Sequence, residues 1–352
     1  MLEAQHNEPF LLDHAPLTPF WRLHVFDGRS HVAKFSVCLC FHHALMDTKS
    51  AVVFQQALEQ AMTHVCSSRA PGVISLPSKP LLPSAEELHH FPVSPGFIAR
   101  QKIEEEPPGN VWSGALQTLP VKTRVRSFWT ADVVTHKLAT RCREEKTSVT
   151  ALLMALLAES FFHVVPASFT SVYGDCAVSL RRFLPGDVID DWSMGVYVGV
   201  FREGYERGAN VWADSAHTKR TMDGIIGSQG ADQATGYLRL VPDLAAWFRK
   251  KLGRKRWAAW ELSNVGALSE SRHDDGPSAR IESLLFSQSA SACSAALKVS
   301  VATGRDGRLG FCFSWQEGVA EEELIRGVID RFSEHLHGTL EFGNQNGENI
   351  VN

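Results

Sequence analysis

The hydrophobic period of the sequence changes abruptly between residues 32 and 65. Val32 to Phe41 is nearly continuous in apolar and small residues, which is the pattern of a strand buried on both faces of a sheet. From Asp47 to Val65 apolar residues recur at helical spacing (Val52, Val53, Leu58, Ala61 and Met62). An earlier strand pattern begins at Trp21, and a turn at Asp27-Gly28 joins the two strands. A buried strand that leads directly into a helix indicates an α/β fold.

The rest of the chain alternates strand and helix patterns around one proline-rich segment. Strands are expected at 125–134, 171–180, 194–201, 260–268, 279–290, 296–304 and 308–315, with a hairpin turn at 304–307. A helical hairpin or broken helix is expected over 135–162, and a final helix over 321–336. Residues 70–120 contain nine prolines and predict a surface crossover without regular structure. We therefore expect mixed sheets in two lobes, residues 1–120 and 121–352.

Composition narrows the class of protein. The 352 residues are 44% apolar and 21% charged, with a net charge of −4, which is typical of a globular protein. Acidic and basic residues are mixed, so neither nucleic acid nor a polybasic membrane surface is expected as a partner. No apolar run approaches the roughly 20 residues of a membrane span. The seven cysteines include no CxxC pair, and the first residues resemble no signal peptide, so we expect reduced thiols and a cytoplasmic location.

The segment with the clearest chemical content is Phe41-His42-His43, followed by Asp47. A neutral imidazole, with a reference pKa of about 6.5, suits the removal of a proton from a hydroxyl group near neutral pH. The alternative is that the two histidines merely end a strand. Metal binding is disfavoured because adjacent strand residues point to opposite faces, so no metal site is expected. Serine hydrolase chemistry is also disfavoured, because no GxSxG motif is present.

Around these histidines, the segment from Trp21 to Met62 resembles the HHxxxDG block of fungal alcohol acetyltransferases. Plant acyltransferases of the BAHD type and condensation domains of peptide synthetases share this block. Five further blocks resemble the fungal group in the right order: VSLRRFLP (178–185), SMGVYVGVFREGYER (193–207), SNVGAL (263–268), FSQSAS (286–291) and VSVATGRDGRLGFCFSWQEG (299–318). The resemblance covers the chain from about Trp21 to Leu336.

The resemblance implies a two-lobed fold similar to that of chloramphenicol acetyltransferase. It implies an O-acyltransferase that moves an acetyl or short acyl group from acyl-CoA to an alcohol, with His43 as the general base and His42 beside it. Asp47 would orient the loop, usually by pairing with an arginine. Arg181 and Arg182 are candidates for that pairing, and a solvated pair of loop residues is the alternative.

The resemblance also implies a hydrogen-bond donor for the oxyanion of the tetrahedral intermediate. The candidates are Ser263, Asn264 and the run Ser287-Gln288-Ser289, although all could equally serve turns and strand packing. Acyl-CoA is expected as a co-substrate, and no bound cofactor is expected. No residues are singled out for binding acyl-CoA. A monomer is expected, and a secondary-metabolite alcohol is a plausible acceptor.

Three departures from the family pattern leave alternatives open. Thr48 replaces the glycine of HHxxxDG, and the DFGWG motif of the plant enzymes is absent. Only 41 residues precede His42, so the N-terminal lobe is expected to be shortened. One alternative is therefore a truncated or non-catalytic relative that binds a metabolite. Another is a condensation-like enzyme that uses a different donor or acceptor.

Overall fold

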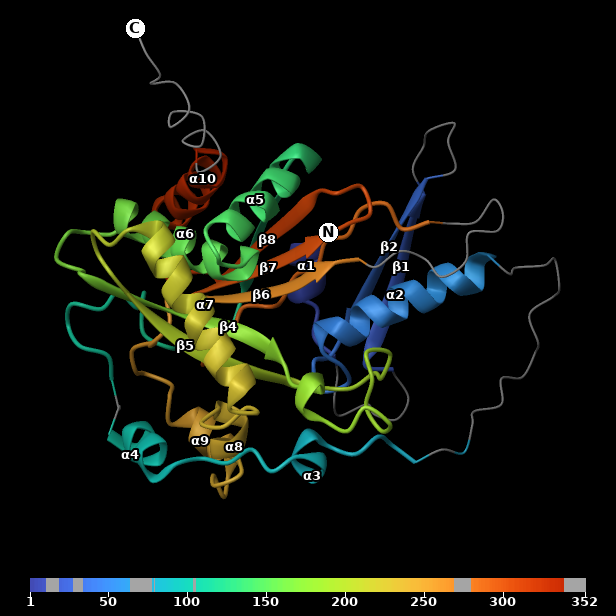
Figure 1. Ribbon diagram of the computed structural model, residues 1–352, viewed down its shortest axis with the longest axis horizontal. Helices are drawn as coiled ribbons and strands as arrows, with labels where there is room; N and C mark the ends of the chain where they lie inside the picture. Colours follow the sequence, from blue (N-terminus) through green and yellow to red (C-terminus); the bar gives the residue numbers. More distant parts are fainter. Residues whose placement is uncertain are drawn as a thin grey trace, which may run out of the picture. The chain divides into compact units, whose positions relative to one another are not determined.

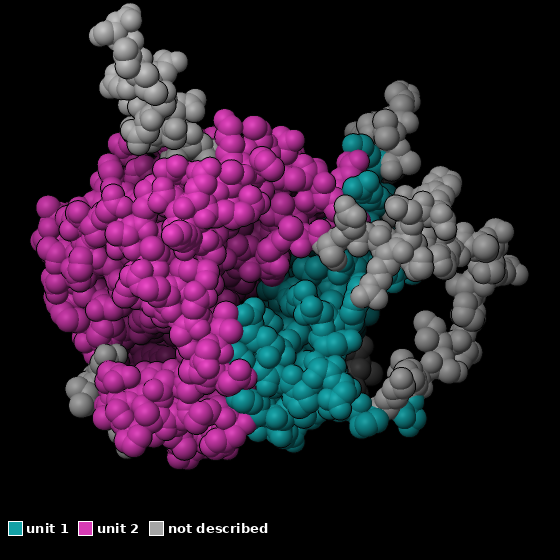
Figure 2. Space-filling view, in the orientation of Figure 1, with its two compact units in different colours: residues 1–89, 179–198, 269–281 teal, residues 90–178, 199–268, 282–352 magenta. Residues whose placement is uncertain are grey.

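The protein divides into two compact units, each made of discontinuous segments (Figure 2). In the computed structural model, residues 1–10, 19–27, 34–63, 78, 80–103, 106–268 and 280–338 are described. Residues 1–89, 179–198 and 269–281 form the first unit, and residues 90–178, 199–268 and 282–352 form the second. Residues 90–120 thus group with the second unit, and the division into lobes at residue 120 stays a prediction.

The first unit contains a strand hairpin and the helix that follows it. Strands β1 (Trp21–Asp27) and β2 (Phe35–Phe41) pair antiparallel with Trp21 opposite Phe41, which confirms the predicted strand pair. Gly28 and Val32 lie outside the described residues. The predicted helix is α2 (Thr48–Thr63). The prediction that β2 is buried on both faces is wrong, because the described sheet has only two strands and Phe35 is exposed.

The second unit is built on a six-stranded mixed sheet (Figure 1). Its strands, in spatial order, are β3 (Thr123–Trp129), β8 (Leu309–Gln316), β7 (Leu297–Thr303), β6 (Trp260–Ala267), β4 (Ser171–Ser179) and β5 (Val198–Glu206). Strands β4, β6 and β7 run parallel, whereas β8 is antiparallel to β7 and β3. The predicted hairpin joins β7 to β8, with Gly307 in the left-handed region at a φ of 74°.

Helices α5 (Asp132–Glu144) and α6 (Val149–Val164) form the predicted broken helix, bent by 99°. The predicted C-terminal helix is α10 (Glu322–Gly338). Phe161 of α6 stacks on Trp260 with ring centroids 5.5 Å apart, and Phe332 of α10 contacts Phe311 at 5.3 Å. These contacts make one face of the sheet the apolar core of the second unit. In the described part of the chain no single helix is long and apolar enough to cross a membrane, and only the bent α5–α6 pair meets the length and composition test.

Several local predictions were incomplete. The proline-rich segment contains α3 (Ala85–Leu88) and α4 (Pro95–Ile103), and α3 begins with a capping box in which Ser84 and Glu87 bond each other's backbone. Helices α1 (Leu2–His6), α7 (Val211–Gly227), α8 (Ala234–Leu238) and α9 (Leu244–Arg249) were not predicted.

The strand expected at 279–290 is absent from residues 280–290. Part of this segment bonds to side chains instead of a neighbouring strand. The carbonyl of Gln288 accepts from Ser314 Oγ, and the amide of Ala290 donates to Thr123 Oγ1. The segment therefore reaches polar side chains of the sheet without joining its ladder of backbone bonds.

Candidate active site

The loop after β2 begins with His42, whose side chain has a structural role. Its amide donates to the carbonyl of Phe20 at 2.9 Å, and its Nδ1 accepts from the amide of Ala44 at 3.2 Å. The half-buried ring lies near the rings of Phe10 and Phe20, with centroids 6.2 and 6.1 Å away. His42 thus fixes the point at which the chain leaves the strand.

His43 has the opposite environment. It lies in the turn that follows β2, and it is exposed. Among the described residues its imidazole has no hydrogen-bond partner. An imidazole with a free nitrogen can accept a proton from a bound hydroxyl group, which is the capacity that the sequence analysis assigned to this position.

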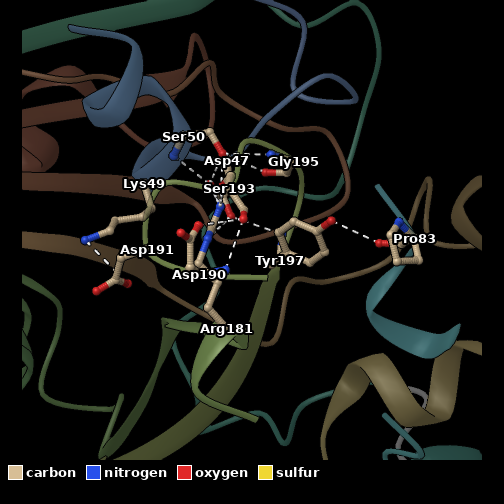
Figure 3. A network of polar contacts seen from close by, with 10 residues as sticks. All are labelled: Asp47, Lys49, Ser50, Pro83, Arg181, Asp190, Asp191, Ser193, Gly195 and Tyr197. Atoms are coloured by element: carbon tan, nitrogen blue, oxygen red, sulfur yellow. Dashed lines mark hydrogen bonds and ion pairs between the residues drawn. The ribbon is translucent and has the colours of Figure 1, made fainter. Parts of the chain in front are cut away.

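Asp47 is buried, with 4% of its surface exposed, and its carboxylate accepts five hydrogen bonds (Figure 3). Oδ1 accepts from the amide of Ser50 at 2.9 Å and from Ser50 Oγ at 2.8 Å. Oδ2 accepts from the amide of Tyr197 at 3.0 Å. The remaining two bonds come from Arg181. All the lone pairs of this carboxylate are directed at protein donors, so it holds structure rather than a substrate.

Arg181 meets Asp47 with both terminal nitrogens. Nη1 donates to Oδ2 at 2.7 Å and Nη2 to Oδ1 at 3.1 Å, which is the bidentate geometry of strong ion pairs. Nη2 also donates to the carbonyl of Ser193 at 3.1 Å, and the guanidinium lies 5.1 Å from the ring centre of Tyr197. This confirms an arginine partner for Asp47. Arg182, the other candidate, is exposed.

These contacts set the protonation state of Asp47. Burial raises the pKa of its carboxyl group, but the hydrogen bonds from Arg181, Ser50 and Tyr197 and the guanidinium charge outweigh burial. The net effect is a pKa below the ordinary value. Asp47 is therefore a fixed anion near neutral pH.

The ion pair joins two distant parts of the first unit. Ser50 Oγ accepts from the amide of Gly195 at 3.0 Å, and the amide of Asp47 donates to the carbonyl of Gly195 at 3.0 Å. A side chain at Gly195 would place its Cβ 2.6 Å from the ring of Tyr197, so only glycine fits. Thr48, where the family pattern has glycine, begins α2 and does not have a positive φ, so the replacement creates no backbone strain.

The predicted oxyanion donors Ser263 and Asn264 belong to the second unit, on β6. Ser263 is buried opposite Ser300 of β7. Asn264 donates from Nδ2 to Thr150 Oγ1 at 3.1 Å and accepts from the amide of Gly266 at 2.9 Å, where the ladder between β6 and β7 becomes irregular. Both contacts shape the end of the strand, and a role toward the oxyanion stays a prediction.

Ser287, Gln288 and Ser289 lie in the irregular segment before β7, also in the second unit. Gln288 Nε2 donates to Ser300 Oγ at 3.3 Å, and Ser287 bonds to the thiol of Cys312. Ser300 pairs with both Ser263 and Cys312 across the sheet. The structure therefore gathers Ser263, Ser287 and Gln288 around Ser300, while their catalytic role stays a prediction.

A row of charges crosses the same face of the sheet and was missed by the sequence analysis. Asp175, Glu261 and Lys298 lie opposite one another on β4, β6 and β7, and neighbours in register share a face. Arg202 of β5 donates to Asp175 at 2.7 and 3.0 Å, and Lys298 is ion-paired to Glu261. Trp260, next to Glu261, points to the other face. The sheet thus has one apolar face and one polar face.

Comparison with known proteins identifies the chain. A model of the alcohol acetyltransferase family matches residues 120–334. A probable alcohol acetyltransferase of Aspergillus fumigatus, crmB, is 32% identical over 93% of this chain and 74% of its own length. The chain belongs to the alcohol acetyltransferase family. Membership was predicted from the sequence, and it makes the protein an acyltransferase. A probable alcohol acetyltransferase of Fusarium pseudograminearum, FCK4, is 26% identical over 93% of this chain and 72% of its own length.

Solved structures confirm the predicted fold class. The TRI3 trichothecene 15-O-acetyltransferase of Fusarium sporotrichioides superimposes with a TM-score of 0.67 at 10% identity, over 91% of this chain and 70% of that one. The epimerization domain from the third module of tyrocidine synthetase B gives 0.59 at 18% identity, over 97% and 76%. This family member therefore has the fold of chloramphenicol acetyltransferase and the condensation domains.

Potential metal-ligating side chains are not clustered in the described part of the protein. In the ranges that the structure describes, no group of three or more histidine, cysteine, aspartate or glutamate side chains could hold one. Asp47, the acidic residue of the HHxxxD block, is saturated by protein donors.

Proposed function

We propose that the protein transfers an acetyl group from acetyl-CoA to the hydroxyl group of a small or medium alcohol, with His43 as the general base. The observation that supports this proposal is the environment of His43. Its imidazole is exposed and unbonded among the described residues, while its loop is fixed at both ends by His42 and Asp47. Membership in the alcohol acetyltransferase family supports the reaction class.

The proposed reaction needs one base that works twice. The neutral imidazole of His43 removes the hydroxyl proton as the alcohol oxygen attacks the thioester carbonyl. The tetrahedral intermediate then collapses, the carbon–sulfur bond breaks, and the imidazolium returns the proton to the departing thiolate. The same imidazole nitrogen thus acts as a base in the first step and, once protonated, as an acid in the second.

Asp47 contributes by position in this proposal. Its depressed pKa and its five hydrogen bonds leave it no proton to exchange. It holds the start of α2 against Arg181, so that His43, four residues earlier, keeps a constant orientation. Ser263, Asn264, Ser287, Gln288 and Ser289 are proposed as the group from which the oxyanion donor comes, because they are polar residues of the family-like blocks.

The acceptor is proposed to be a secondary-metabolite alcohol, because a relative of the same fold is a trichothecene O-acetyltransferase. The acyl-CoA donor is proposed from family membership, and a cytoplasmic monomer remains the expectation for the protein's state. A carrier-protein thioester is the alternative donor, since condensation domains share the fold.

The experiment measures free thiol released from acetyl-CoA by the purified protein with a panel of alcohols. His43→Ala should reduce turnover by about 10²–10⁴-fold, the usual contribution of a general base. His136→Ala, which removes an exposed histidine of α5, is the matched control and should retain full activity. Undiminished thiol release from folded His43→Ala protein would refute the proposal. If thiol is released only when a carrier-protein thioester is supplied, that thioester is the donor in place of acetyl-CoA.

A further inference from the structure

The second unit carries a local concentration of positive charge that the net charge of −4 conceals. Six of the eight residues from Arg249 to Arg256 are basic, so acidic and basic residues are not evenly mixed in this part of the chain. Arg249, Lys250 and Arg254 are exposed and Lys255 is half-buried. None of these four has an ion-pair partner among the described residues.

The other two basic residues of the run are held by the protein. The buried Arg256 donates to the carbonyl of Ala115 and to Gln316 Oε1, and the ammonium of Lys251 lies 3.7 Å from the ring centre of Trp247. Burial and the nearby guanidinium of Arg202 lower the pKa of Lys251 to about 8. Neither Arg256 nor Lys251 is ion-paired to a carboxylate in the part of the chain that the structure describes.

Large apolar side chains are exposed beside these cations. Leu240 is 53% exposed, Leu244 45% and Phe248 42%, along the chain that ends α8 and forms α9. Leu244 and Phe248 are four residues apart on α9 and so share one face of the helix. Apolar residues at helical spacing normally face a core, whereas these face solvent.

A second segment brings two more exposed apolar side chains close to the basic residues. The amide of Gln117 donates to the carbonyl of Arg254 at 2.9 Å, and the amide of Gly253 donates to the carbonyl of Gln117 at 2.8 Å. Residues 116–119 therefore lie beside the turn at Gly253 and Arg254. Leu116 and Leu119 on this segment are both exposed.

We propose that these side chains form a surface that docks the protein on an anionic lipid bilayer. The lipid-binding surface comprises the apolar residues Leu116, Leu119, Leu240, Leu244 and Phe248 and the cations Arg249, Lys250, Arg254 and Lys255. Exposed apolar side chains among unpaired cations match the interface of such a bilayer, where acyl chains lie beneath anionic headgroups. A soluble polyanion would account for the cations but leave the five apolar side chains in water.

The test is co-sedimentation of the full chain with vesicles of phosphatidylcholine alone or with one quarter phosphatidylserine. Binding should be at least ~10-fold tighter to the anionic vesicles and should weaken with added salt. Replacing Arg249, Lys250, Arg254 and Lys255 together by glutamine should reduce that binding by ~100-fold or more, since each basic residue near the surface contributes about 1 kcal/mol. Leu119→Ser, Leu240→Ser and Leu244→Ser together should reduce it by ~10-fold or more.

A matched control removes the same charge elsewhere: Lys137, Arg143, Lys146 and Arg220, all exposed in the second unit, are replaced together by glutamine. This variant should bind the anionic vesicles within ~3-fold of the unmodified protein. Equal loss in the control, or no preference for phosphatidylserine, would overturn the proposal. Retained binding to anionic vesicles in the four-cation variant would overturn it too. Sedimentation needs no turnover, so the result is independent of the proposed reaction.

Discussion

The two ends of the histidine loop differ more than their separation of four residues suggests. His43 is exposed and has no bonded partner among the described residues, whereas Asp47 is buried and bonded on every side. A residue that exchanges protons with a substrate must leave its lone pair available. A residue that fixes a loop must have its lone pairs occupied. In the proposed mechanism His43 is therefore the reacting group and Asp47 the structural one.

The largest expected effect separates these two roles by stability. Asp47→Ala leaves the Arg181 guanidinium buried without a counterion, which should lower the free energy of unfolding by about 3–5 kcal/mol. His43→Ala removes an exposed side chain and should change it by less than about 0.5 kcal/mol. Urea denaturation of both variants measures the difference. Similar losses in the two variants would contradict the division of roles.

Arg181→Lys should have the next largest effect. Lysine keeps the positive charge but loses the fork that meets both oxygens of Asp47 and the carbonyl of Ser193. The free energy of unfolding should fall by about 1–3 kcal/mol, because buried acceptors lose donors. Arg182→Lys, at the neighbouring exposed position, is the control and should be nearly neutral. A neutral Arg181→Lys would show that charge alone holds the loop.

Tyr197→Phe tests the far side of the same network. The Tyr197 hydroxyl donates to the carbonyl of Pro83 at 2.9 Å, so its removal should cost about 1 kcal/mol of stability. Tyr237→Phe is the comparison, since the Tyr237 hydroxyl has no hydrogen bond among the described residues. Thermal unfolding should show a lower Tm for Tyr197→Phe but not for Tyr237→Phe. Equal Tm values would show that the hydrogen bond to Pro83 does not stabilise the network around Asp47.

Lys49→Gln should have a smaller effect than any of these. Lys49 is 3.8 Å from Asp191 in the same part of the unit, but both side chains are exposed. Exposed pairs contribute about 0–1 kcal/mol and are screened by salt, so a loss below about 0.5 kcal/mol is expected. Denaturation at low and high salt measures it. If Lys49→Gln lowered the free energy of unfolding as much as Asp47→Ala, burial would not explain the difference between the Lys49–Asp191 and Arg181–Asp47 pairs.

Acidification should remove the contribution of Asp47 to the free energy of unfolding, whereas pH changes near neutrality should leave it unchanged. The pKa of Asp47 is lower in the folded protein than its ordinary value of about 3.9, so its stabilising contribution is complete above that value. The contribution is lost as pH falls through the lower, folded pKa. Asp47→Asn should remove this part of the acid dependence when unfolding is followed from pH 6 to pH 2. An unchanged pH profile would contradict it.

Local patterns predicted much of the fold, because they report contacts between residues near in sequence. The hairpin of β7 and β8, the bent α5–α6 pair and helix α10 all follow from periodicity and turn residues. The order of the strands does not, since β3 pairs with β8, the last strand of the sheet, and β4 pairs with β6 as well as with its successor β5. The segment before β7 has strand composition, but some of its backbone groups bond to Ser314 and Thr123 side chains.

The residues of the proposed site are visible in the sequence where a single segment carries them. The spacing of His43 and Asp47 identified both residues. The sequence also predicted Arg181 or Arg182 as the partner of Asp47, and only the structure shows that Arg181 is the buried one. The row formed by Arg202, Asp175, Glu261 and Lys298 is spread over four strands, so its pairing is not visible in sequence. Its only local signal was a charged residue within an apolar strand, such as Lys298 in LKVSV.

The Asp47–Arg181 contact joins residues 134 positions apart, and the first unit includes a segment as late as residues 269–281. During synthesis at about 5–20 residues per second, the histidine loop therefore waits roughly 7–27 seconds for the arginine that completes it. Throughout that interval the Asp47 carboxylate lacks its guanidinium partner. The interleaving of the chain therefore sets the order of assembly: the loop that carries Asp47 is made early and is completed only after Arg181 has followed it.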